Sequence, residues 1–269
     1  MIDRGFCRTA DGLIHYRSAG HAAAPPLVML HGGPGSSASL VPLMIQLADK
    51  FRIIAPDTMG CGDSEPAPAA VPDIADYARY LARFLDDVGV ARATVYGHHT
   101  GAQIACELAI AAPHRVTRLI LDGTALFAPD VRAEFVERYA PPLVPLESGK
   151  HLEWLWHFAR DLPRYFPHYR KDADHQTALG QPLPGDAATW IVAEALKAWP
   201  TWHLAYRAAF SHDLAARLPA LTMPALVFAV TGDPLAACAA PAAALIHDAV
   251  CRAVARGDRA EQIARFTGI

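Results

Sequence analysis

The sequence lacks the features that would place this protein in a membrane, on a nucleic acid or in an oxidising compartment. No apolar run is long enough to cross a bilayer, and the first residues lack the apolar region of a secretory signal peptide. The net charge is −3 without any basic cluster, which argues against nucleic acid as a partner. The five cysteines are an odd number without paired spacing, which predicts reduced thiols and no zinc site. These absences predict a cytoplasmic protein that binds neither membranes nor nucleic acids.

Short apolar runs alternate with helix-prone segments over most of the 269 residues. Two strands within 6–19 meet at Asp11-Gly12, a favourable two-residue hairpin turn. Further strands are expected at 27–30, 52–56, 92–96, 116–121, 224–230 and 249–254. Helices are expected at 39–49, 73–89, 102–112, 236–247 and 259–267. This alternation predicts an α/β fold with a mostly parallel, doubly wound sheet of eight strands.

The alternation stops near Thr124. From 126 to 214 no apolar strand follows, and the segment is rich in histidine, aromatic residues and proline. We therefore expect a core formed by 1–125 and 215–269, with 126–214 as a helical cap inserted after the sixth strand. Of the cap's polar and aromatic residues, Trp156 and His157 are predicted to contact the substrate.

The most informative stretch is Gly97-His98-His99-Thr100-Gly101. A short β-rich run precedes it, and a helix-prone segment with apolar residues at helical spacing follows it. The stretch is therefore expected to be a tight turn between a strand and a helix, with a glycine at each end.

Four motifs of the chain resemble those of the α/β-hydrolase superfamily, in that superfamily's order. They are His31-Gly32-Gly33-Pro34-Gly35, the segment 57–64 ending Gly-x-Gly-x-Ser, the turn 97–101, and Gly232-Asp233. The resemblance covers nearly the whole chain and implies an α/β-hydrolase fold. It also implies an oxyanion hole formed by the backbone amides of Gly33 and Thr100, and a catalytic acid at Asp233.

Two catalytic positions depart from the superfamily's pattern. His99 stands where the nucleophile, usually serine, is expected, and Asp258 stands where the catalytic histidine is expected. Ordinary Ser-His-Asp chemistry is therefore not available at these positions. The two changes can compensate each other if the Asp258 carboxylate, with Asp233 as a second acid, orients the His99 imidazole. His99 would then act as a general base or as a nucleophile, without a cofactor.

Two functions remain open at this point. The first is a hydrolase or lyase that cleaves a small apolar carbonyl compound such as an ester, a lactone or a β-keto acid. The second is a catalytically degenerate relative that binds a small ligand, as the absent serine and histidine would permit.

His98 is expected to pack behind the turn or to contact the substrate. A metal held by both histidines is not expected, because adjacent residues of a tight turn point in different directions. The protein is expected to be a monomer or a homodimer.

Overall fold

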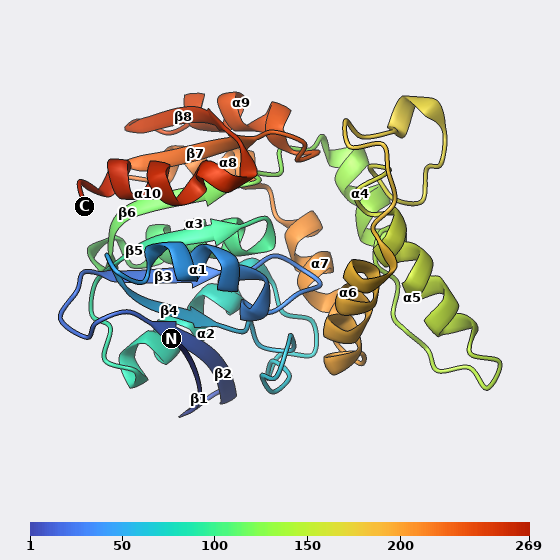
Figure 1. Ribbon diagram of the computed structural model, residues 1–269, viewed down its shortest axis with the longest axis horizontal. Helices are drawn as coiled ribbons and strands as arrows, with labels where there is room; N and C mark the ends of the chain where they lie inside the picture. Colours follow the sequence, from blue (N-terminus) through green and yellow to red (C-terminus); the bar gives the residue numbers. More distant parts are fainter.

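One eight-stranded sheet runs through the protein in the computed structural model, which describes residues 1–269 (Figure 1). The strands are β1 (Ile2–Thr9), β2 (Gly12–Ala19), β3 (Pro26–Leu30), β4 (Arg52–Pro56), β5 (Ala93–His98), β6 (Val116–Asp122), β7 (Ala225–Val230) and β8 (Ala249–Val254). Their order across the sheet is β1-β2-β4-β3-β5-β6-β7-β8, and β3 to β8 are parallel. The predicted fold class is confirmed.

The two N-terminal strands form the antiparallel edge of this sheet. The predicted hairpin is present, but its turn lies one residue earlier than Asp11-Gly12: Thr9 pairs with Gly12, so that the chain turns at Ala10 and Asp11. The Thr9 hydroxyl donates to the Gly12 carbonyl at 3.0 Å and accepts from the Asp11 amide at 3.1 Å, which closes the turn. β2 then pairs antiparallel with β4 and joins the hairpin to the parallel strands.

Helices cover both faces of the sheet. They are α1 (Val41–Leu47), α2 (Ile74–Asp87), α3 (Thr100–Ala111), α8 (Leu214–Arg217), α9 (Ala239–Ala244) and α10 (Arg259–Thr267). Short 3-10 helices lie at Ser37–Leu40, Pro113–Arg115, Ala173–His175, Leu218–Ala220, Ala236–Cys238 and Arg256–Asp258.

Alternate residues of each buried strand pack on opposite faces. In β3, Val28 and Leu30 join the larger core cluster with α2, α3, α8 and α9, whereas Leu27 and Met29 join the cluster with α1 and α10. Strands buried on both sides explain why their sequences are continuous apolar runs. Asp73 caps the N-terminus of α2, because its carboxylate accepts from the Asp76 amide at 2.7 Å.

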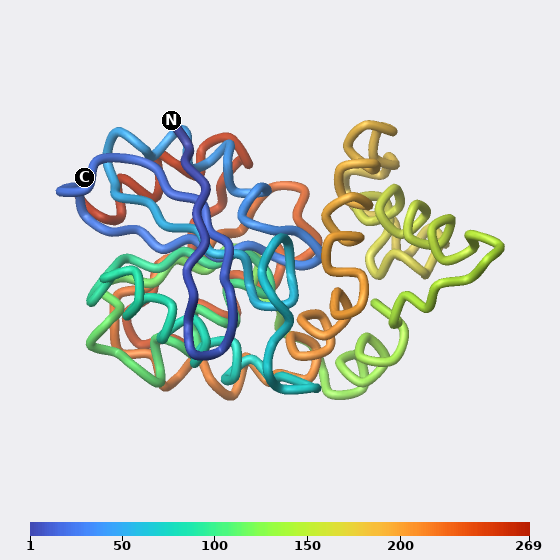
Figure 2. The backbone as a smooth tube through the Cα atoms, turned by 90° about the horizontal axis from the view of Figure 1, so that it is seen from below, coloured from blue at the N-terminus to red at the C-terminus, as the bar shows by residue number.

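Four helices lie between β6 and α8, within residues 126–214, which we call the cap segment. They are α4 (Pro129–Arg138), α5 (Lys150–Asp161), α6 (Gly185–Lys197) and α7 (Trp202–Ser211). Figures 1 and 2 show them as a separate lobe beside the sheet, with α7 next to it. The lobe has its own aromatic core, in which Phe158 and Trp202 are almost fully buried. None of the helices combines the length and apolarity needed to cross a membrane.

Two glycines allow β5, the turn and α3 to pass very close to one another. A Cβ atom on Gly97 would lie 2.3 Å from the Gly101 carbonyl oxygen, and one on Gly101 would lie 2.5 Å from the Leu30 carbonyl oxygen. Both contacts are with backbone atoms, which have little freedom to move. Only glycine fits at these two positions, because the backbones pass so close to each other.

We predict that Gly101→Ala destabilises the protein by about 3 kcal/mol, the upper end of the usual cost of overpacking. The clash with the β3 backbone outweighs the higher helix propensity of alanine, which is worth about 1 kcal/mol. Denaturant unfolding measures the change. The matched control is Gly257→Ala, since no atom lies within 4 Å of the added methyl group. It should stay within about 0.5 kcal/mol of the parent. Equal stability of the two variants would contradict the tight crossing.

Candidate active site

The chain contains one large cavity, of about 510 Å³, between the sheet and the cap segment. The core residues that line it follow the carboxyl ends of strands, where open α/β sheets bind ligands. They include Gly32–Gly35 after β3, His98–Thr100 at the end of β5, Gly232–Leu235 after β7, and Arg256 and Arg259 after β8. Residues from every motif identified in the sequence therefore line the cavity, except those of the segment 57–64.

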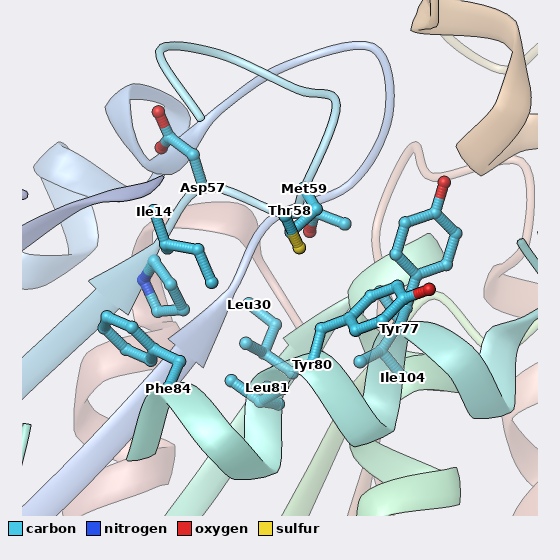
Figure 3. A pocket seen from close by; sticks show the side chains of 11 residues that line it. Ile14, Leu30, Asp57, Thr58, Met59, Tyr77, Tyr80, Leu81, Phe84 and Ile104 are labelled. Carbon is cyan, nitrogen blue, oxygen red and sulfur yellow. The ribbon is translucent and has the colours of Figure 1, made fainter. Parts of the chain in front are cut away.

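A second, much smaller cavity lies between the sheet and α2 (Figure 3). Its volume is about 20 Å³, enough for one water molecule and no ligand. Apolar side chains such as Leu30 and Phe84 surround it, and the Asp57 carboxylate points away from it in Figure 3. That carboxylate instead accepts from the Ser37 amide at 2.8 Å and is hydrogen-bonded to His15 at 2.8 Å. Residues 57–64 thus support the loop after β3 and do not line the large cavity.

His99 occupies a strained backbone position at the turn. Its φ of 50° and ψ of −111° make it the only non-glycine residue with a positive φ. Such a conformation costs about 1–3 kcal/mol and persists only where neighbours hold it. The His99 amide donates to the Asp122 carbonyl at 2.8 Å. Gly123 leaves room for the ring, because a Cβ atom there would lie 2.0 Å from His99 Cδ2. The imidazole is thereby held at the cavity wall.

Asp233 is the carboxylate that pairs with His99. The distance between His99 Nε2 and Asp233 Oδ2 is 2.8 Å. A carboxylate only accepts, so Nε2 carries the proton and donates it, which leaves Nδ1 as the available base. The Asp233 side chain is 4% exposed, and the Leu235 amide donates to its other oxygen at 2.8 Å. The His99 side chain is 30% exposed and faces the cavity.

The pair shifts the pKa of both members. Burial lowers the pKa of His99, but the hydrogen bond and negative charge of Asp233 outweigh it, so that the pKa of His99 is raised. Burial raises the pKa of Asp233, and the hydrogen bond to His99 overcomes this and holds it well below its usual range. The carboxylate is therefore charged at neutral pH, whereas the imidazole gains and loses its proton above its ordinary range.

His98 lies against the His99 ring rather than away from it. The two imidazoles are stacked, with centroids 4.0 Å apart and planes 16° from parallel. Burial, the charge of His99 and the charge of Arg259 lower the pKa of His98 far below the ordinary value, so it is neutral. Single ligand atoms of His98, His99 and Asp233 lie within 4.8 Å of one another, which suits a divalent cation sterically. Arg259 opposes cation binding, because its positive charge acts on both His98 and His99 and would repel the cation.

The loop after β3 presents its backbone toward the same cavity. Gly33 lines the cavity, and so does Thr100, whose amide is in the first turn of α3 and has no acceptor within that helix. His31 braces the loop: its Nδ1 donates to the Gly32 carbonyl at 3.0 Å, and its Nε2 accepts from the Thr58 amide at 3.0 Å. Both ring nitrogens are engaged, so His31 is structural.

A buried ion pair lies beneath the turn. Arg259 Nε is 2.7 Å from Asp122 Oδ2, and the Tyr96 hydroxyl donates to the same carboxylate at 2.5 Å. Burial raises the pKa of Asp122, while the charge of Arg259 and the hydrogen bond from Tyr96 act against that rise. Asp122 therefore supports the turn through its side chain and through its carbonyl, which accepts from the His99 amide.

The prediction that Asp258 orients the His99 ring is wrong. Asp258 is exposed, does not line the cavity, and makes no hydrogen bond to His99. The chain after β8 forms a 3-10 helix and then α10, and this path directs Arg256 and Arg259 toward the cavity and Asp258 toward solvent. The second acid considered in the sequence, Asp233, makes the contact instead.

The prediction that Trp156 and His157 contact the substrate is also wrong, since neither residue lines the cavity. On α5 the buried residues are Leu155, Phe158 and Ala159. Successive helical residues are about 100° apart, so the two residues between Leu155 and Phe158 point elsewhere. His157 is 45% exposed and lies 3.9 Å from Glu153.

Sequence reasoning missed several residues of the site. One is Gly123, whose lack of a side chain leaves space for the His99 ring. Glu194 of α6 is 5% exposed, accepts a short hydrogen bond from the Ser36 hydroxyl, and lies 2.9 Å from Lys197. The i, i+3 spacing of Glu194 and Lys197 was the only available signal, and it does not distinguish a buried pair from a surface pair.

We predict that NMR titration of His99 gives a pKa above the ordinary histidine value of about 6.5. Asp233→Asn removes the charge that raises it, so the pKa should fall in that variant. The exposed Asp258→Asn is the matched control and should leave the titration unchanged. A fall of the His99 pKa in the Asp258 variant, with none in the Asp233 variant, would reverse our assignment of the partner.

Part of the chain is similar in sequence to curated proteins. The chain is 32% identical over 125 residues to haloalkane dehalogenase 2 of Mycobacterium tuberculosis, a match that spans 46% of this chain and 43% of that protein. The chain thus matches less than half the length of that relative.

Solved structures resemble the chain over almost its full length. A hydrolase from Pseudomonas aeruginosa superposes with a TM-score of 0.76 at 22% identity, over 99% of both chains. The enol-lactonase from Burkholderia xenovorans superposes with a TM-score of 0.75 at 19% identity, over 98% of this chain and 100% of that one. At these identities the likeness concerns the fold. The family model described as "alpha/beta hydrolase fold" matches residues 25–244. Because this match covers most of the chain, the protein belongs to the α/β hydrolase fold family.

Proposed function

We propose that the protein is a hydrolase that cleaves a small carbonyl compound, an ester or lactone, with His99 as the general base. The observation that carries the proposal is the 2.8 Å hydrogen bond between His99 and Asp233 at the wall of a 510 Å³ cavity. If His99 had no catalytic role, it would need neither a buried carboxylate partner nor a strained backbone. Here both are present, and both have a cost in stability.

The proposed reaction uses the two ring nitrogens of His99 differently. Nε2 donates to Asp233 throughout, and Nδ1 takes a proton from a water molecule. The resulting hydroxide attacks the carbonyl carbon, and the Gly33 and Thr100 amides stabilise the oxyanion. When the carbon–oxygen bond breaks, the leaving oxygen takes the proton from Nδ1. One ester and one water thus give one acid and one alcohol, and His99 returns to its starting state.

Direct attack by Nδ1 on the carbonyl is a second route at the same residue. It would give an acyl group on the imidazole, which water then removes. The raised pKa of His99 favours the role of base, since its proton affinity is increased by Asp233. Mass spectrometry of the protein quenched during turnover separates the routes, because only the second adds mass to the chain.

We also propose that the cap segment, 126–214, forms the roof that selects the substrate, over a core of 1–125 and 215–269. Aromatic side chains from this segment line the cavity: Phe127, Tyr139, Phe166, Trp190, Tyr206 and Phe210. They favour a substrate with an apolar body. The even mixture of charges and the five free cysteines support a place in the cytoplasm.

His99→Ala should lower kcat by about 10²–10⁴-fold on a panel of esters, lactones and β-keto acids, the usual contribution of a general base. Activity of the parent should rise with pH through an inflection above 6.5, because the base must be unprotonated and its pKa is raised. Steady-state assays over pH 5–9 measure both effects. Asp258→Asn serves as the control and should keep the parent's rate and profile. Full activity of the His99 variant would remove this residue from the reaction.

The second candidate function is ligand binding without turnover. It is favoured by the replacement of two of the three residues that the family's catalysis uses. Calorimetry with the same panel distinguishes the two functions. Binding with no product after prolonged incubation would support the binder, whereas turnover that depends on His99 would exclude it.

A further inference from the structure

Nearly every charged side chain that lines the cavity already has a partner of opposite charge. Asp233 is paired with His99, Glu194 lies 2.9 Å from Lys197, and Arg259 lies 2.7 Å from Asp122. The remaining charged residue of the lining, Arg256, forms no ion pair and no side-chain hydrogen bond.

Arg256 is exposed, like Arg252 and Asp258, but unlike them it lines the cavity, at the end that holds His99 and Asp233. It is the first residue of the 3-10 helix Arg256–Asp258, which follows β8, the neighbour of the strand that leads to Asp233. The pKa of His98 is lowered chiefly by burial and by the charges of His99 and Arg259, and the charge of Arg256 adds to this effect. Arg256 and the two histidines thus line the same cavity, and the charge of Arg256 reaches His98.

The rest of the lining offers no other unpaired cation for a carboxylate. Toward the cap segment the cavity is aromatic, and the two lining carboxylates would repel an anion. His98 is neutral, and the proton on His99 Nε2 is engaged by Asp233. A single guanidinium matches a single carboxylate, which it binds through two parallel N–H···O hydrogen bonds. A doubly charged phosphate would meet only one free cation here.

We propose that Arg256 is the carboxylate-binding residue of this cavity, and that the substrate is an ester or lactone with a free carboxylate near its reacting carbonyl. The carboxylate would contact Arg256 while the apolar part lies against the cap segment. The substrate half of this inference rests on the proposed function, but anion binding at Arg256 does not, so the two are tested separately.

The kinetic test compares monomethyl succinate with dimethyl succinate, which differ only in the free carboxylate. For the parent protein, kcat/KM should favour the monoester. In Arg256→Gln the ratio of the two kcat/KM values should fall by about tenfold or more, as expected for loss of a hydrogen bond to a charged group. Arg252→Gln is the matched control, since Arg252 is exposed on β8 and does not line the cavity. It should keep the parent's ratio. The same ratio in both variants, or a parent preference for the diester, would overturn the proposal.

The binding test needs no turnover. Isothermal titration of the parent with succinate should show binding that weakens as salt is added, and that weakens about tenfold or more in Arg256→Gln. Arg256→Lys should recover part of the affinity, because an ammonium keeps the charge but not the paired geometry. Succinate binding through Arg256 without hydrolysis of either ester would refute the proposed function and keep the carboxylate site. Hydrolysis with no succinate binding, and no effect of Arg256 on the ratio, would keep the function and refute the site.

Discussion

The hydrogen bond between His99 and Asp233 joins the two parts of the structure on which the site depends. One is the strained turn between β5 and α3, and the other is the loop after β7. Gly97 and Gly101 let the turn pack closely against the neighbouring backbone, and Gly123 leaves space for the His99 ring. The carboxylate then fixes which nitrogen carries the proton. This bond and the one from the His99 amide to the Asp122 carbonyl together hold the strained backbone of His99.

The charges around this bond are arranged in compensated pairs at different depths. Asp122 and Arg259 lie beneath the turn, Asp233 and His99 lie at its surface, and His98 between them is kept neutral. Removing one member of a buried pair leaves an uncompensated charge, which costs several kcal/mol. Among the charged side chains that line the cavity, Arg256 is therefore the exception, because it has no partner of opposite charge.

The sheet, its hairpin and the helices of the core could be predicted because their signals are local. Continuous apolar runs, glycines at turns and the Asp73 cap each act within a few residues. The partner of His99 could not be chosen in this way, since Asp233 and Asp258 follow two neighbouring parallel strands, β7 and β8, at the same end of the sheet. Only the path of the chain after β8 decides that Asp258 faces solvent. Trp156 and His157 failed for a similar reason, because the phase of α5 is set by what Leu155 and Phe158 pack against.

The hydrogen bond between Ser36 and Glu194 joins the core to the cap segment across the cavity. Ser36 belongs to the loop after β3, which also carries Gly33, and Glu194 belongs to α6 of the cap segment. If α6 swings outward to admit a molecule, this contact must break, and the glycine-rich loop loses an anchor at the same moment. In the proposed reaction, such a movement of α6 would therefore couple substrate entry to the position of the Gly33 amide.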